Sequence, residues 1–267
     1  MESVTAQPEK RYRIQSIDLL RGLVMIIMAL DHTRDYFHWS SQVYDPLDLS
    51  QTSVAIFLTR WITHFCAPVF MFLAGTSAYF VGQRKTKKQL SFFLFTRGLW
   101  LMLLELTVVY FGWSFNMHFP VSALITIWAL GAAMVALSVL IYLPYKVILA
   151  FGILIVACHN LFDNFHVAGN SLQAFIWDEL HDPRALNFYG HTVITGYPIL
   201  PWIGIITLGY CFGKLYGKEF NVTKRKKWLL LIGCSAVLLY IILRAGNFYG
   251  DQQLWTSQHS NFFTFLS

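Results

Sequence analysis

The chain has 267 residues, of which 56% are hydrophobic and only 13% are charged, about half the charged share of a typical soluble domain. A water-soluble domain of this length cannot bury so much apolar surface, so the composition indicates a protein that lies in lipid. The net charge of +6 does not indicate a nucleic-acid partner, because the basic residues fall in short runs between apolar segments.

Apolar segments of about 20 residues, the length that a helix needs to cross a bilayer, follow one another along the chain. We expect an all-α, polytopic transmembrane bundle of about seven spans, forming a single domain over residues 1–267. The spans are predicted near 16–37, 54–80, 92–113, 121–143, 146–161, 197–216 and 228–245. Membrane-spanning strands are disfavoured, because the apolar runs are continuous and show no period-two alternation.

The basic residues alternate between loops, which predicts the orientation of the chain. One set of segments carries Lys10, Arg11 and Arg13, then Arg84, Lys85, Lys87 and Lys88, then Lys146, and finally Lys218 and 224–227. The loops between them, 38–53, 114–120 and 162–196, contain no Lys or Arg except Arg184. This alternation predicts a cytoplasmic N-terminus. The compact loops and the lack of organelle signals favour a bacterial cytoplasmic membrane.

Two other segments lie outside the predicted spans. The long loop 162–196 carries several Asp, Glu and His residues with Trp177 and Pro183, so we expect it to be partly folded and to form a lid or an acceptor-binding element. Residues 261–267 turn apolar again. We expect Asn261 to cap a helix that leads into further spans, with an interfacial tail as the alternative.

The cysteines and one histidine cluster give no metal or redox motif. Cys66, Cys158, Cys211 and Cys234 all lie in apolar stretches without a CxxC spacing, which is typical of small buried side chains. His159, Asn160 and Asp163 could ligate an ion, but their spacing is no more than chance would give. We therefore expect no metal.

The first predicted span carries the most polar residues. Its residues Asp18, Arg21, Met25, Met28, His32 and Asp35 recur at intervals of three and four, which places them on one helical face. Ionisable groups in a membrane are costly and therefore indicate function. His32 and Asp35 suit a general base with an orienting carboxylate. The alternatives are a structural pair for Asp18 and Arg21, and an ordinary polar helix end for His32 and Asp35.

The second span repeats this pattern. Arg60 precedes His64 by four residues, so the two side chains share a face. Pro68 follows His64 by four residues and is expected to kink the helix there. A histidine beside a kink can open onto a cavity, while a hydrogen-bonded structural histidine is the equal alternative.

The third and sixth spans add polar and small residues. Glu105 lies near the middle of the third span and Arg97 at its start, and we expect Glu105 to pair with Arg97, Arg60 or His64, in either a structural or a proton-relay role. In the sixth span Gly204, Gly209 and Gly213 predict a close-packing helix face.

Three separated motifs, in order, resemble bacterial membrane proteins related to heparan-α-glucosaminide N-acetyltransferase. They are the stretch from Ser16 to Val24 with its continuation from Asp31 to Phe37, the stretch from Ala67 to Ser77, and the stretch from Tyr197 to Gly204 followed by Gly209 and Tyr210. The Asp18, Arg21 and His32 spacing also resembles the wider group of membrane acyltransferases that modify cell-surface sugars.

The resemblance implies transfer of an acyl group, usually acetyl, from cytoplasmic acyl-CoA to a sugar amine or hydroxyl beyond the membrane. One position departs from the family pattern: the loop histidine of the sugar N-acetyltransferase falls near Val43 here, which has no acid-base chemistry. The departure moves the catalytic assignment to His32 and His64 and leaves N- or O-acylation open. Members of the family are also longer than this chain.

The residues assigned on this basis are His32, His64 and Asp35 for catalysis, and Arg21, Arg60 and Arg97 for the phosphates of acetyl-CoA. The expected partners are membrane lipid, acyl-CoA and an extracytoplasmic glycan; the oligomeric state is left open. A proton-coupled transporter or lipid-intermediate carrier that uses His32, His64 and Glu105 as a relay is the alternative function. A purely structural membrane subunit is a third.

Overall fold

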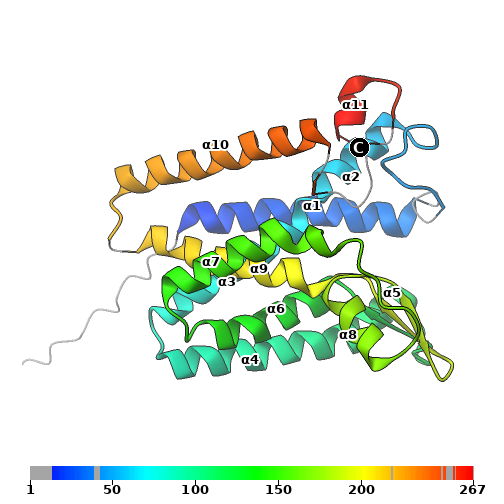
Figure 1. The fold of residues 1–267 in the computed structure, drawn as a ribbon, viewed down its shortest axis with the longest axis horizontal. Coiled ribbons are helices and arrows are strands. Elements are labelled where there is room, and N and C mark those ends of the chain that lie inside the picture. Colours follow the sequence, from blue (N-terminus) through cyan, green and yellow to red (C-terminus); the bar gives the residue numbers. More distant parts are fainter. Residues whose placement is uncertain are drawn as a thin grey trace, which may run out of the picture.

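The computed structural model of the chain describes residues 14–38, 43–217, 219–247, 249–250, 255 and 257–266. The predicted cytoplasmic residues Lys10, Arg11, Arg13 and Lys218 lie outside the described residues. Helix dominates the described chain, as expected for an all-α bundle, and one short sheet lies at one end (Figure 1).

The long helices correspond to the predicted spans, with shifted ends. They are α1 (Gln15–Phe37), α2 (Val54–Thr63) with α3 (Cys66–Gly82), α4 (Lys87–Leu104), α6 (Thr126–Leu140), α7 (Tyr145–Cys158), α9 (Ile199–Gly213) and α10 (Val222–Gly246). Within the described residues, five segments are long and apolar enough to cross a membrane: Val54–Gly82, Lys87–Ser114, Tyr145–Phe162, Ile199–Tyr216 and Val222–Gly246. The predicted number of about seven is therefore slightly high. Helix α6 is shorter, and α1 contains several charged residues.

Short elements extend or connect these helices. They are the π-helix η2 (Glu105–Val109) and α5 (Tyr110–Ser114) after α4, η3 (His159–Phe162) after α7, η4 (Lys214–Tyr216) after α9, α8 (Leu172–Leu180) in the long loop, and α11 (Asn261–Leu266). Helix α11 begins at Asn261, as predicted. Ser260 rather than the predicted Asn261 caps it, since the amide of Phe263 in the first turn donates a hydrogen bond to Ser260 Oγ at 3.4 Å.

The predicted span 121–143 is wrong at its start. Residues Val121–Leu124 form strand β1, which pairs in parallel with β3 (His191–Thr195), and β3 pairs antiparallel with β2 (Ala185–Phe188). Ile125 has a non-helical backbone, with φ −118° and ψ −143°, and β1 finds its hydrogen-bond partners on β3 rather than in a helix. The sheet joins the loop before α6 to the loop 162–196, which is folded as expected.

Close helix packing builds the centre of the bundle. Helix α9 packs against α3, α6 and α7, α4 packs against α6, and α1 lies against α2 and α3. The glycines of α9 allow these contacts, as predicted. A Cβ on Gly209 would lie 2.0 Å from the carbonyl oxygen of Phe72, and one on Gly75 would lie 1.9 Å from that of Ile206.

The helices place the chain's polar segments at two ends. We call the end that carries Lys87, Lys88, Lys146, Lys214 and residues 224–227 the basic end, and the opposite end, with β1, β2, β3 and α8, the sheet end (Figure 1). Helix α10 contains no buried residue and stands apart from α1 in Figure 1. Because the other helices do not cover it, α10 is free to face lipid or another protein.

Candidate functional site

A break in the second predicted span lies close to its polar residues. Helix α2 ends at Thr63, His64 caps it, and α3 begins at Cys66. Pro68 sits in the first turn of α3 and has no N–H to donate to the carbonyl of His64. The helical hydrogen bonding is therefore interrupted at His64 and Phe65, as a kink at Pro68 predicts, although both residues keep helical φ and ψ and Val54–Gly82 remains one membrane-length segment. His64 lies in this turn and is exposed.

Asp31 is the centre of an ion-pair network between α1 and α2. Its carboxylate accepts a hydrogen bond from Thr63 Oγ1 at 2.6 Å and lies 3.4 Å from Arg60 Nη1. It also pairs with Arg34 one turn later in α1. The Arg34 guanidinium also forms an ion pair with Asp35, with 3.0 Å between Arg34 Nη2 and Asp35 Oδ1. Two carboxylates thus balance two guanidinium groups, which is the arrangement that makes buried charge tolerable.

Arg34 is the most deeply buried charged residue of this network, since only 6% of the residue is exposed. Sequence reasoning passed over both Asp31 and Arg34 because they lie beside the predicted polar face of α1 rather than on it. The signal available in the sequence was their spacing of three, which lets an acidic and a basic side chain meet on one helix.

His64 lies next to the network, among the charges of Arg60, Asp31 and Arg34. Arg60, which was predicted to share a helical face with His64, lies close enough for its charge to act on the imidazole, and its guanidinium also reaches Asp31. An exposed imidazole at a helix break, next to two guanidinium groups, can exchange a proton with a bound molecule and can stabilise a developing negative charge nearby.

His32 lies on another face of α1. Its ring packs edge-on against the indole of Trp113 in α5, with 5.3 Å between centroids, and Tyr36 stacks on the same indole at 4.4 Å. Among the described residues, no contact joins His32 to His64, and the carboxylate of Asp35 turns to Arg34. The structure therefore places His64 at the network and His32 against α5.

The predicted polar face of α1 is not the face that the helix buries. The buried residues of α1 are Ile17, Val24 and Arg34, whereas Met25 is 53% exposed. Helix α1 instead turns Val24 toward α3, where the thiol of Cys66 lies 3.8 Å from the carbonyl oxygen of Val24. The ion pair predicted between Asp18 and Arg21 is present at 3.5 Å.

Two adjoining cavities open near the basic end. The first, of about 440 Å³, lies between α1, α3 and α9 and is lined by Ser16, Ile17, Leu20, Pro68, Val69, Phe72, Leu73, Ile205, Phe212 and Tyr216. The second, of about 570 Å³, is lined by Ile14, Gln15, Ser16, Tyr216, Val222, Arg225, Lys226 and Leu229. The two cavities share Ser16 and Tyr216 and therefore adjoin. We call the first, mostly apolar cavity the apolar slot, and the second, which is lined by Arg225 and Lys226, the basic mouth.

None of the three arginines assigned to acetyl-CoA lines either cavity. Arg21 donates to Ser77 Oγ at 2.9 Å, and the Arg97 guanidinium stacks on Phe93 at 4.7 Å. The basic side chains at the mouth are Arg225 and Lys226. They were missed because the run 224–227 was interpreted only as an orientation signal.

Glu105 does not pair with Arg97, Arg60 or His64 as predicted. It is 1% exposed, and its Oε2 accepts hydrogen bonds from the backbone amides of Ile127 at 2.8 Å and Trp128 at 3.0 Å. A carboxylate at this place satisfies the first amides of α6 and suits the helix dipole. Glu105 therefore anchors α6 to η2, which weakens the case for a proton relay through it.

A second buried carboxylate joins the sheet end to the bundle. The side chain of Glu179 in α8 accepts a hydrogen bond from Trp128 Nε1 at 2.5 Å. Burial raises the pKa of Glu179 to about 7, although the hydrogen bond from Trp128 acts in the opposite direction. Next to it, Asp178 is fully buried and pairs with Arg184 Nε at 2.6 Å.

Comparison with protein families gives one match. Residues 13–244 match the model of the catalytic region of heparan-α-glucosaminide N-acetyltransferase, which includes both helices of the network and both cavities. Comparison with curated proteins and with solved structures gave no significant match. The family is one of membrane acetyltransferases, and the apolar helices of this chain agree with a multi-pass membrane protein. The chain therefore belongs to the heparan-α-glucosaminide N-acetyltransferase catalytic family.

Proposed function

We propose that the chain transfers an acetyl group from acetyl-CoA, bound at the basic end, to a sugar amine or hydroxyl beyond the membrane. The distribution of basic residues supports a cytoplasmic basic end and hence a cytoplasmic N-terminus. The sheet end then faces the outside of a bacterial cytoplasmic membrane. The observation that carries the proposal is the pair of adjoining cavities, one basic and one apolar, that leads from the basic end toward the break at His64.

The basic mouth suits the phosphate groups of CoA. Arg225 and Lys226 lie in the first turns of α10, where free backbone amides and the helix dipole also favour anions. The Arg225 guanidinium lies 5.2 Å from the ring of Tyr216, which holds it at the junction of the two cavities. Arg225 and Lys226 replace Arg21, Arg60 and Arg97 as the proposed phosphate ligands.

The apolar slot suits the pantetheine arm and its thioester. It begins at Ser16, near the basic mouth, and extends to Pro68 and Val69 in the first turn of α3. Pro68 is four residues from His64, so the far end of the slot approaches the helix break. A thioester at that end would lie near the charged network, and an acceptor would enter from the sheet end.

In the proposed reaction, the acceptor nitrogen or oxygen attacks the thioester carbonyl carbon. The carbon–sulfur bond breaks, and CoA leaves as the thiolate. His64 takes the proton of the acceptor and returns it to the thiolate, so that atoms and charges balance. Arg60 stabilises the oxyanion that forms on the carbonyl oxygen, and Asp31 holds Arg60 in place. Asp35 acts through Arg34, and His32 is the second candidate base.

Kinetics of purified protein with labelled acetyl-CoA and an amino sugar test the donor site. Replacing both Arg225 and Lys226 by Ala should raise the KM for acetyl-CoA by about 100-fold or more, since each lost charged hydrogen bond costs roughly 1.5–3 kcal/mol and about 1.4 kcal/mol is tenfold. The matched control is Lys224→Ala, because Lys224 belongs to the same run but stacks on Phe220 instead of lining the cavity. An unchanged KM in the double variant would exclude this donor site.

The same assay tests the base. His64→Ala should lower kcat by about 10²–10⁴-fold, the range for loss of general-base catalysis. His118→Ala is the control, because His118 is exposed in the loop after α5. A loss of activity in His32→Ala but not in His64→Ala would transfer the role to His32. Full activity in both variants would refute histidine catalysis at either position.

A further inference from the structure

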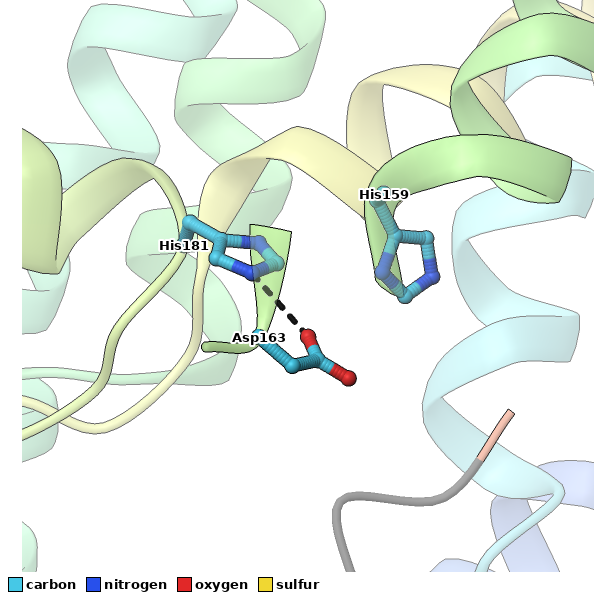
Figure 2. Close-up of side chains that lie close together, drawn as sticks. All are labelled: His159, Asp163 and His181. Atoms are coloured by element: carbon cyan, nitrogen blue, oxygen red, sulfur yellow. Dashed lines mark ion pairs between the residues drawn. The ribbon is translucent and has the colours of Figure 1, made fainter. Parts of the chain in front are cut away.

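Two histidines and an aspartate from separate segments meet at the sheet end. His159 and Asp163 lie one turn apart, in and directly after η3, and His181 caps the C-terminus of α8. Figure 2 shows the three side chains converging, with an ion pair of 3.0 Å between His181 Nε2 and Asp163 Oδ1. The sequence alone predicted no metal, because the spacing of His159 and Asp163 is no better than chance would give; folding of the loop adds His181 as a third residue and changes that prediction.

The ligand atoms are close enough for one ion. One nitrogen of each histidine and a carboxylate oxygen of Asp163 all lie within 4.8 Å of one another. A tetrahedral zinc site with bonds of about 2.0–2.1 Å needs its ligands about 3.3 Å apart, which small rotations of the side chains would give. Asp163 is already held in place, since its other oxygen accepts a hydrogen bond from Asn160 at 3.0 Å.

The burial of His181 calls for a partner at its ring. The residue is only 4% exposed, and within the described part of the chain neither ring nitrogen has a hydrogen bond of good geometry, despite the short distance to Asp163. Buried polar groups are almost always satisfied, by protein, water or an ion. The rings of Phe162 and Trp177 lie against His181 at 6.1 and 5.5 Å between centroids and give the apolar surroundings common around metal ligands.

We propose that His159, Asp163 and His181 bind a divalent transition-metal ion, for which Zn²⁺ is the best fit. Imidazole nitrogens suit zinc, whereas Mg²⁺ and Ca²⁺ prefer sites made only of oxygen. Three protein ligands leave one tetrahedral position open to water or to a group of a bound molecule. The site joins the end of α7 to α8, so the ion also fastens the folded loop 162–196 to the bundle.

The experiment uses the full chain, purified in detergent with a tag that contains no histidine and stripped with a chelator. Zn²⁺, Mn²⁺ and Mg²⁺ are titrated separately by calorimetry, and bound zinc is counted by mass spectrometry. We expect one zinc per chain, weaker manganese binding and no magnesium binding. Zinc should also raise the melting temperature, because an ion that binds only the folded state stabilises it.

The variants His159→Ala and Asp163→Asn should each weaken zinc binding by about 100-fold or more and abolish the thermal shift. These two positions are more exposed than His181, so they carry the test even if His181→Ala does not fold. His166→Ala is the matched control, since His166 lies in the same loop and pairs with Asp182 at 2.8 Å. Absence of zinc binding in the unmodified chain, or equal binding in all variants, would overturn the proposal.

Discussion

The contact between α3 and α9 leaves no room for a methyl group at Gly75. The Cβ of an alanine there would lie 1.9 Å from the carbonyl oxygen of Ile206 and 2.7 Å from the backbone nitrogen of Tyr210. Both neighbours are backbone atoms of a helix, so no side-chain rotation can relieve the overlap. We predict that Gly75→Ala forces the two helices apart and destabilises the protein.

The size of the effect follows from the distance. Carbon–oxygen contacts are usually about 3.3–3.6 Å, so α9 must retreat from α3 by more than about 1 Å at this point. Overpacking of a core costs roughly 1–3 kcal/mol, occasionally more, and a clash with backbone belongs at the upper end. A loss of about 3 kcal/mol corresponds to a fall in melting temperature of about 6–12 °C for a chain of this size.

Thermal unfolding of the purified protein in detergent measures this directly. The matched control is Gly22→Ala in α1, where an added Cβ meets nothing within 4 Å and alanine favours helix. Because α3 and α9 also form two walls of the apolar slot, we expect Gly75→Ala to raise the KM for acetyl-CoA. Equal melting temperatures for the two variants would refute the close packing described here.

Three further substitutions test other contacts. Glu179 holds its proton more strongly in the folded state, with a pKa of about 7 against 4.5 for the free side chain, so stability should fall as pH rises between these values. Glu179→Gln should remove this fall, and an unchanged pH profile of melting temperature would contradict the assignment. Glu105→Ala should cost about 1–3 kcal/mol by leaving two amides of α6 unpaired; Glu105→Gln should recover part of the loss, and equal melting temperatures for the two would refute the capping role. Asp31→Ala should destabilise the protein by about 3–5 kcal/mol, whereas Asp18→Ala, at an exposed pair, should cost less than about 1 kcal/mol, and the reverse order of melting temperatures would contradict the network.

The bundle itself was predictable because lipid imposes length and hydropathy on every span. The break at Pro68 and the glycine contacts of α9 also followed from single residues whose chemistry is local. The start of the fourth span was not predictable in the same way. Val121–Leu124 is as apolar as a helix would be, and only the distant strand β3 makes it a strand.

The candidate site was less predictable than the fold. A spacing of three or four residues shows that side chains share a helical face, but it does not show which face the bundle buries. In α1 the buried charged residue is Arg34, which pairs with the partly buried Asp31; neither residue was on the face predicted from the spacing of Asp18 and Asp35. The basic mouth could not be predicted from the sequence, because it forms only where α1, η4 and α10 come together. His181 could not be assigned to the cluster with His159 and Asp163 until the folding of the loop was known.

Acetyl transfer across a sealed membrane tests the central claim most directly. Inverted vesicles, with the cytoplasmic face outward, would enclose an amino sugar and receive labelled acetyl-CoA outside; right-side-out vesicles with the same contents are the comparison. The account predicts labelled acetyl-sugar inside the inverted vesicles, no product in the right-side-out vesicles, and loss of product with His64→Ala. Absence of enclosed product in inverted vesicles, or equal product in both orientations, would contradict it.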